Sequence, residues 1–242
     1  MRILLLGGTT EANRMAHALH TAGIDAVYSY AGRTLSPVAQ PIPTRSGGFG
    51  GVAGLRDYLR ANHITHVIDA THPFAAGMSS NAVQACDIPL CALERPPWAL
   101  NQSWITVPDI ESVPAALPVA PARVFLAIGK QHIGLFARTP HHYLLRLVDP
   151  PAAPLPLPDA HAIIAKGPFN YETDLALLRE HRIDLIVSKN SGSDGARAKL
   201  DAARTLNLPV IMIARPHIPT RTTFATPDEV LRWLSHSADR GV

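Results

Sequence analysis

Residues 2–11 read RILLLGGTTE and are the strongest indication of the fold class in this sequence. Residues 3–6 are a continuous apolar run, which indicates a strand buried on both faces of a parallel sheet. The two glycines end this strand, and the two threonines after them can cap a helix. Gly23 ends that helix, and residues 26–31 are expected to form the next strand. The order strand, helix, strand predicts a β-α-β unit with a right-handed crossover.

The same alternation continues along the chain. Residues 66–70 (HVIDA) predict another buried strand, a helix is expected over about 75–86, and residues 89–93 predict a further strand. Residues 32–51 are rich in proline and glycine and are expected to form a loop. A last helix should begin at Pro227, because TPDE at residues 226–229 combines a capping box with proline at the first helical position.

A second series of strands and helices fills the rest of the chain. Four prolines within residues 107–121 mark a junction, so we expect domains at residues 1–110 and 120–242. We predict an α/β protein with two flavodoxin-like or Rossmann-like halves, each a small parallel sheet flanked by helices. In the second half, strands are expected over 123–128, 143–148, 162–165, 184–188 and 209–214, and helices over 130–137, 171–181 and 194–206.

Composition limits the class of function. The chain has 242 residues, with 22 Lys and Arg against 19 Asp and Glu, a net charge of +3. This weak, scattered basic balance suits an anionic small ligand and does not favour nucleic acid. Two cysteines, Cys86 and Cys91, are too few for a disulfide framework. No apolar run is long enough for a signal peptide or a membrane span, and no long apolar surface stripe stands out, so we expect a cytoplasmic monomer without a membrane partner.

The loop after the first strand is a candidate phosphate site, because ligands of open parallel sheets bind beyond the carboxyl ends of the strands. Its glycines allow close approach, and the following helix offers its N-terminus. An NAD site usually has an acid at the end of the second strand, but residues 27–33 (VYSYAGR) have none. Ser29 and Arg33 stand there instead, so NADP is favoured over NAD if a dinucleotide binds. A tight turn without a ligand and a solvated Arg33 are the alternatives.

Residues 69–74 (DATHPF) bring polar side chains to another strand end. Asp69 lies in an otherwise apolar strand, so its carboxylate needs hydrogen-bond partners and is expected to orient the loop rather than react. His72 could donate to a phosphate or to a substrate carboxylate, or serve as a proton source. The alternative for His72 is a purely structural role.

Residues 166–169 (KGPF) and 188–192 (SKNSG) end two strands of the second half. Their ammonium groups, hydroxyls and amide fit a polyanionic substrate better than an apolar one, and solvated loops are the alternative. The sequence has no P-loop, no G-x-S-x-G elbow and no cluster with metal-ligand spacing, so no metal is expected.

Several of these stretches resemble the precorrin-6A reductase family of corrin biosynthesis, and they occur in order over nearly the whole chain. They are residues 3–11 (ILLLGGTTE), 47–51 (GGFGG), 68–75 (IDATHPFA), 94–98 (ERPPW), 166–169 (KGPF), 186–195 (IVSKNSGSDG) and 209–216 (PVIMIARP). The resemblance implies an NADPH-dependent oxidoreductase that reduces one double bond of the macrocycle, with a proton added at the neighbouring carbon. It also implies that nucleotide and macrocycle bind in a cleft between the halves. Reductases of metal-free and of cobalt-containing substrates are closely similar, so both substrates stay open at this point.

The resemblance further implies roles for residues at the strand ends. The nucleotide would be bound by Gly8, Thr9, Thr10 and Glu11, its 2′-phosphate by Ser29, Gly32 and Arg33, and the nicotinamide or its phosphates by Thr71, His72 and Pro73. The acetate and propionate arms of the tetrapyrrole would be bound by Lys166, Ser188, Lys189, Asn190, Ser191 and Arg215. His72 and Lys166 are hypothetical proton donors, although hydride transfer itself requires mainly that the two partners be oriented.

Two other functions are alternatives to this interpretation. One is a reductase of another small anionic substrate, but the Tyr-x-x-x-Lys pair typical of such enzymes is absent. The other is an NADP-binding sensor without catalysis, which would need ligand-binding residues in the first half only. Polar strand ends throughout the second half argue against the sensor.

Overall fold

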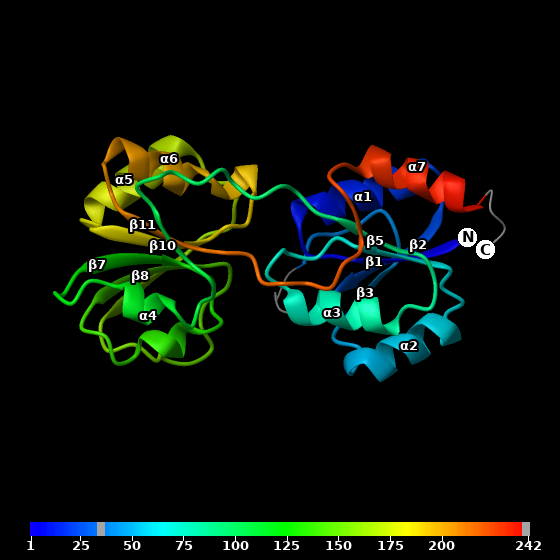
Figure 1. The fold of residues 1–242 in the computed structure, drawn as a ribbon, viewed down its shortest axis with the longest axis horizontal. Helices are drawn as coiled ribbons and strands as arrows, with labels where there is room; N and C mark the ends of the chain where they lie inside the picture. Colours follow the sequence, from blue (N-terminus) through cyan, green and yellow to red (C-terminus); the bar gives the residue numbers. More distant parts are fainter. Residues whose placement is uncertain (33–36, 239–242) are drawn as a thin grey trace. The chain divides into compact units, whose positions relative to one another are not determined.

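The structure, a computed structural model, describes residues 1–32 and 37–238. The chain forms two compact units (Figure 1). Met1–Pro96 and the chain from His217 onward make the first unit, and Pro97–Pro216 make the second. Each unit is built on its own parallel sheet, in agreement with the predicted α/β class.

The first unit contains a six-stranded sheet whose neighbouring strands are all parallel. Its elements are β1 Arg2–Leu6, α1 Thr10–Thr21, β2 Asp25–Tyr30, β3 Thr44–Ser46, α2 Gly51–Ala61, β4 His66–Asp69, α3 Ala76–Ala85, β5 Leu90–Leu93, β12 Thr222–Phe224 and α7 Pro227–Ala238. The strand order is β12-β5-β4-β1-β2-β3. Helices α1 and α7 cover one face, and α2 and α3 cover the other (Figure 1).

Side chains of β1 alternate between the two helical layers. Ile3 and Leu5 pack with residues of α1 and α7, whereas Leu4 and Leu6 pack with residues of α2 and α3. All four side chains are buried. The continuous apolar run therefore forms a central strand, as predicted, because helices cover both faces of the sheet.

The second unit contains another six-stranded parallel sheet. Its elements are β6 Ile105–Val107, α4 Val113–Ala116, β7 Arg123–Ala127, η1 Ile133–Phe136, β8 His142–Leu147, β9 Ala160–Ile164, α5 Tyr171–Glu180, β10 Leu185–Lys189, η2 Asp194–Ala196, α6 Ala198–Thr205 and β11 Val210–Ile213. The strand order is β6-β11-β10-β7-β8-β9. Phe125, Leu144 and Ile186 pack beneath α5 and α6 on one face, and α4 lies on the other (Figure 1).

The division between the units differs from the predicted boundaries of 1–110 and 120–242. Strand β6 pairs with β11 of the second sheet, and β12 pairs with β5 of the first. Residues 97–110 therefore belong to the second unit, and the chain returns to the first unit at His217. Both strands have only three residues with mostly exposed side chains, so no apolar run in the sequence marks them.

Some local predictions also need correction. The helix expected over 130–137 is only a short 3-10 turn, which follows a positive φ of 64° at His132. The helix expected over 194–206 is divided into η2 and α6. Within the expected loop 32–51, β3 adds a strand beside β2. The capping box at the start of α7 is confirmed, because the Glu229 carboxylate accepts the N–H groups of Ala225 and Thr226.

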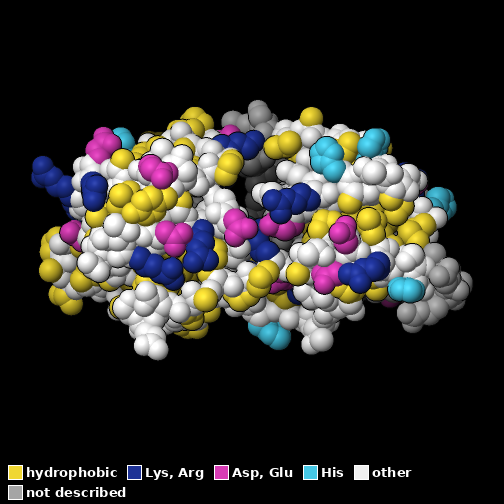
Figure 2. Space-filling model, turned by 90° about the horizontal axis from the view of Figure 1, so that it is seen from above, with side chains coloured by type: hydrophobic (Ala, Val, Ile, Leu, Met, Phe, Trp, Pro, Cys, Tyr) yellow, Lys and Arg dark blue, Asp and Glu magenta, His cyan; other side chains and the backbone are white. Residues whose placement is uncertain are grey.

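Charged side chains of both signs are interspersed on the face shown in Figure 2. Within residues 1–32 and 37–238, every helix is too short or too polar to cross a bilayer. The same described residues contain no group of three or more His, Cys, Asp or Glu side chains placed to hold a metal ion.

Candidate functional site

The turn after β1 lies at the carboxyl edge of the first sheet. Gly7 has no room for a side chain, because a Cβ there would lie 2.2 Å from the ring of Tyr28. Gly8 has a φ of +113° and donates its N–H to the Tyr28 hydroxyl over 2.8 Å. Gly7 is thus required by the neighbouring Tyr28 ring and Gly8 by its backbone conformation, and the Tyr28 hydroxyl holds the turn through its hydrogen bond with Gly8.

Thr9 fixes the start of α1. Its hydroxyl oxygen accepts the N–H of Ala12, and the hydroxyl donates to the carbonyl of Ala70 over 2.8 Å. Thr10 follows with an exposed side chain in the first helical turn. The helix therefore presents an N-terminus at this edge, where partial positive charge favours an anion.

Tyr28 also connects this turn to the chain that follows β2. Its hydroxyl donates to Oδ1 of Asn13 over 2.9 Å, and the same oxygen accepts Nε2 of Gln40 over 3.0 Å. Gln40 also donates to the hydroxyl of Tyr30. Burial raises the pKa of the Tyr28 phenol well above its usual value, so the phenol stays protonated and keeps its donor role.

Two ion-paired groups lie beside the turn. Arg95 pairs with Glu11, and both side chains are largely buried. Arg221 lies 2.8 Å from Glu94 and 3.8 Å from Asp69, measured between nitrogen and carboxylate oxygen. The Glu11 carboxylate is thus paired with Arg95, and the Glu11 backbone lies at the start of α1. Arg95 lies in the ERPPW stretch, whereas no sequence signal pointed to Arg221.

Asp69 holds the loop after β4. Its Oδ1 accepts both the N–H of Thr71, over 3.1 Å, and the Thr71 hydroxyl, over 2.7 Å. Asp69 therefore orients the loop, which is the role its sequence position predicts. In His72, Nδ1 accepts the N–H of Phe74 over 3.2 Å, so the neutral ring carries its proton on Nε2. His72 is half-buried, and Pro73 beside it is buried.

The end of β2 carries no acid in the structure either. Ser29 is buried and accepts a hydrogen bond from Nη1 of Arg45 over 2.7 Å. Gly32 has a φ of +74° and lies against Gly47. Arg33, which the sequence assigned to a 2′-phosphate, lies outside the described residues. Arg45 is a basic residue that the sequence reasoning missed, because nothing local shows that β3 pairs with β2.

In the second unit, the SKNSG loop follows β10 and is largely turned inward. Asn190 accepts the N–H of Trp98 over 2.7 Å and donates to the Trp98 carbonyl over 3.2 Å. Arg215 donates to the carbonyls of Asn190 and Ser191. Three predicted substrate-binding residues are buried here: Ser188 within β10, and Asn190 and Ser191 directly after it.

Other predicted residues of this unit remain more accessible. Lys166 follows β9 and is exposed, and Lys189 at the end of β10 is half-buried. These two ammonium groups therefore extend from the carboxyl edge of the second sheet. The predicted residues accordingly divide into two sets, one at the carboxyl edge of each sheet.

A buried charge cluster that the sequence did not predict lies near α5 and α6. Arg146 pairs with Asp174, and its guanidinium lies 4.0 Å from the centre of the Phe169 ring. Lys199 is buried, and its Nζ lies 5.0 Å from the centre of the Trp98 ring. Burial lowers the pKa of Lys199 to about 8, and the Asp174 carboxylate opposes part of this shift.

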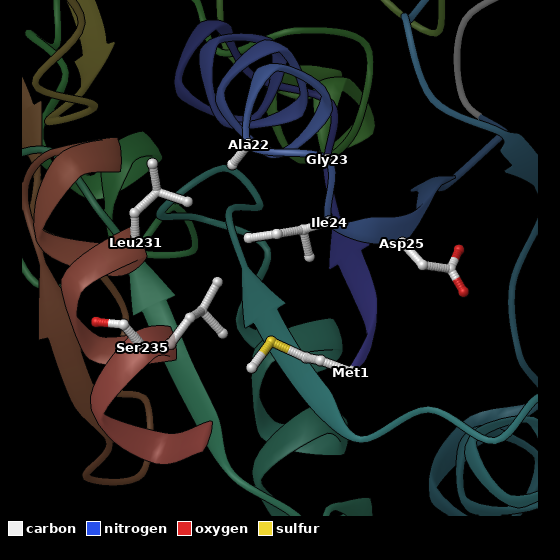
Figure 3. A pocket seen from close by; sticks show the side chains of 8 residues that line it. Met1, Ala22, Gly23, Ile24, Asp25, Leu231 and Ser235 are labelled. Atoms are coloured by element: carbon white, nitrogen blue, oxygen red, sulfur yellow. The ribbon is translucent and has the colours of Figure 1, made fainter. Parts of the chain in front are cut away.

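A pocket of about 470 Å³ lies at the opposite, amino edge of the first sheet. Met1, residues 22–25 and three residues of α7 line it. Leu231 and Ser235 come from α7, Ile24 points toward them, and the Asp25 carboxylate points away (Figure 3). This mainly apolar pocket shares no residue with the polar turns at the carboxyl edge.

Known proteins resemble this chain over its full length. The family described as precorrin-6x reductase CbiJ/CobK matches residues 2–235. A precorrin-6A reductase of Rhodobacter capsulatus is 60% identical over 249 aligned positions, covering 100% of this chain and 99% of its own. A cobalt-precorrin-6A reductase of Priestia megaterium is 29% identical, covering 96% and 97%. A solved structure described as CobK precorrin-6A reductase has a TM-score of 0.93 at 60% identity, covering 100% of this chain and 98% of that one.

Proposed function

Because the chain belongs to the precorrin-6x reductase CbiJ/CobK family, we propose that it reduces one double bond of precorrin-6A with NADPH in cobalamin biosynthesis. The match over residues 2–235 carries this proposal. The full-length relative from Rhodobacter capsulatus, at 60% identity, supports precorrin-6A as the substrate. The relative named for a cobalt-containing substrate is only 29% identical, which favours the metal-free macrocycle here.

The carboxyl edge of the first sheet fits a dinucleotide. The turn after β1 packs closely on Tyr28 at Gly7 and is open at Gly8, where a Cβ would meet nothing within 4 Å, and Thr9 caps the N-terminus of α1, which would face an incoming phosphate. Gly8, Thr10 and the backbone of Glu11 complete this phosphate-binding turn. When bound, NADPH supplies the hydride that reduces the macrocycle. The absence of an acid at the end of β2 supports NADPH over NADH.

The remaining residues of this edge would orient the reactive end of the nucleotide. Asp69 fixes Thr71 through two hydrogen bonds, and this places the Thr71–Pro73 backbone beside the turn that Thr9 holds. Ser29, Gly32 and Arg33 would receive the 2′-phosphate. The protein's main task is orientation, since positioning two reactants removes much of the entropic barrier to their reaction.

On the second unit, cationic groups would bind the carboxylate arms of the tetrapyrrole. Lys166 and Lys189 offer ammonium groups, and the inward bonds of Asn190 and Arg215 hold the SKNSG backbone in place beside them. Ser188, near the end of β10, and Ser191, in the turn after it, would bind the same arms. A carboxylate gains a charge-assisted hydrogen bond from each ammonium group that it meets.

Addition of hydride to one carbon requires a proton at its neighbour. His72 would donate this proton from Nε2, because its Nδ1 is an acceptor for Phe74. Lys166 would donate it from Nζ. We expect either His72→Ala or Lys166→Ala to lower kcat more than threefold, equal to about 0.65 kcal/mol. The matched control is Lys130→Ala, because Lys130 is an exposed lysine that follows β7. An unchanged kcat in both test variants would exclude His72 and Lys166 as proton donors.

The decisive experiment is a fluorescence titration with NADPH and NADH, followed by anaerobic turnover of precorrin-6A. We expect NADPH to bind at least tenfold more tightly, about 1.4 kcal/mol, and to be oxidised only when the macrocycle is present. Binding without turnover of either the metal-free or the cobalt-containing macrocycle would favour an NADP sensor. Equal use of NADH would contradict the cofactor assignment.

A further inference from the structure

Arg45 stands directly across from Ser29 in the parallel ladder between β2 and β3. Tyr28 and Tyr30 belong to the core that α1 and α7 cover, so the strand alternation turns Ser29 to the α2 face. On that face, Nη1 of Arg45 donates to Ser29 Oγ over 2.7 Å. The serine hydroxyl and the guanidinium are therefore neighbours at the carboxyl end of β2.

The guanidinium is held in one orientation. Nη1 also donates to the carbonyl of Gly47 over 2.8 Å, and Nη2 donates to the carbonyl of Gly48 over 3.1 Å. Its central carbon lies 4.0 Å from the centre of the Phe49 ring and 5.3 Å from that of Tyr58. Three hydrogen bonds and two aromatic rings thus hold the planar guanidinium in place. An arginine side chain without such contacts would be mobile.

This cation keeps donors for a further acceptor. Among residues 1–32 and 37–238, Nε and one N–H of Nη2 have no hydrogen-bond partner, and no carboxylate pairs with Arg45. The other arginines of this edge differ, because Arg95 pairs with Glu11 and Arg221 pairs with Glu94. The full positive charge of Arg45 is therefore available to an anion.

Together these observations define the ligand chemistry. In open parallel sheets, the end of the second strand meets the ribose of a bound adenosine. A fixed guanidinium beside a hydroxyl suits a phosphate monoester, which offers several charge-assisted acceptor oxygens, better than it suits a ribose hydroxyl. We propose that Arg45, positioned by Ser29 and the Gly47–Gly48 carbonyls, binds the 2′-phosphate of the cofactor and sets the preference for NADPH over NADH.

This proposal rests on the proposed NADPH dependence and adds a residue that determines it. It differs from the assignment of the 2′-phosphate to Arg33, because it places the cation on β3 rather than in the loop after β2. A purely structural role is the competing explanation, since Arg45 also holds the carbonyls of the glycine-rich segment. The two roles can be distinguished by the ligand: loss of the 2′-phosphate contact weakens only ligands that carry a 2′-phosphate, whereas a disturbed loop weakens all adenine nucleotides.

The test uses calorimetric titrations of the full chain with adenosine 2′,5′-bisphosphate and with AMP. We expect Arg45→Met to weaken bisphosphate binding at least tenfold while AMP binding changes less than twofold. Arg45→Lys keeps a cation without the planar fork and should lose less. Arg60→Met, which removes an exposed arginine of α2 whose partner is Asp87, is the matched control and should change neither ligand.

Two results would overturn the proposal. Equal losses for bisphosphate and AMP would assign Arg45 a loop-holding role, and unchanged bisphosphate binding would exclude Arg45 as a ligand. Should Arg45→Met fail to fold, Ser29→Ala serves instead, with an expected loss of about threefold for the bisphosphate only. If the unmodified protein binds neither NADPH nor the bisphosphate, the proposed cofactor fails first, which distinguishes that failure from failure at Arg45.

Discussion

At the carboxyl edge of the first sheet, acidic side chains are neutralised by arginines, as in the Glu11–Arg95 pair, and Arg45 retains its charge. At the carboxyl edge of the second sheet, the amide of Asn190 is buried against the Trp98 backbone, whereas Lys166 is exposed. Both edges contain residues that the sequence marks as ligands. A polar residue at a strand end can therefore have either of two roles: it can bind a ligand, or it can stabilise the loop whose other residues bind the ligand.

The largest expected effect comes from the buried arginines. Arg221→Met removes the guanidinium that pairs with Asp69 and Glu94, and Arg146→Met removes the one that pairs with Asp174, so each should lower stability by about 3–5 kcal/mol. Hydrogen exchange followed by mass spectrometry should locate the lost protection in the first unit for Arg221→Met and in the second for Arg146→Met. The exposed Arg204, paired with Asp201, provides the control variant Arg204→Met.

The control variant Arg204→Met should lower the free energy of unfolding by less than about 1 kcal/mol, because the ion pair that it removes is exposed. Loss of protection spread equally over both units in either test variant would contradict the view that each edge is stabilised by its own charge pairs.

An intermediate effect is expected from Asn190. Asn190→Ala removes both bonds to the Trp98 backbone and leaves buried groups unpaired, which should cost about 2–3 kcal/mol of unfolding free energy. Lys166→Ala, at an exposed position of the same edge, should change stability by less than about 0.5 kcal/mol. Denaturant unfolding of both variants measures this difference. If Asn190→Ala is as stable as the unmodified protein, Asn190 would again be a candidate for binding the substrate.

The smallest effect depends on pH and concerns Lys199. Its pKa in the folded protein is about 8, below the ordinary value of 10.5. Below pH 8 both the folded and the unfolded chain bind this proton, and the cost of burying the charge is complete. Between pH 8 and 10 the unfolded chain binds more protons than the folded chain, so stability rises with pH, by about 2 kcal/mol over this interval.

Lys199→Met should lack this rise. Unfolding free energies measured at pH 7, 8, 9 and 10 for the unmodified protein and for Lys199→Met should therefore diverge as pH increases. If the two plots of unfolding free energy against pH run parallel, the pKa of Lys199 would not be lowered in the folded protein, which would contradict the prediction.

Much of the fold follows from local sequence. The apolar run at residues 3–6 and the helical spacing of Ala12, Met15 and Leu19 place β1 and α1 correctly, since burial on a strand or a helix face leaves a periodic pattern. The capping box at the start of α7 is equally local. Predicting β6 and β12 was not possible in this way, because three mostly exposed residues carry no pattern.

The candidate site shows the same limit. The sequence identified the strand ends that carry polar residues, including Asp69, whose bonds to Thr71 follow from residues two positions apart. It did not identify Arg45, Arg95 or Arg221 as neighbours of these strand ends. Their positions depend on which strands pair and on where the chain returns to the first sheet.

The amino-acid sequence alone is enough to predict two series of alternating strands and helices and the family to which the chain belongs. Apolar periodicity, turn residues and motifs all occur within contiguous stretches, so they can be recognised without the folded structure. Only the tertiary structure decided that Ser29 meets Arg45, that Glu94 meets Arg221, and that Asn190 closes on Trp98, 92 positions away. The physical reason is that a buried polar group takes whichever partner the folded chain brings within hydrogen-bond distance, and that partner leaves no local signal.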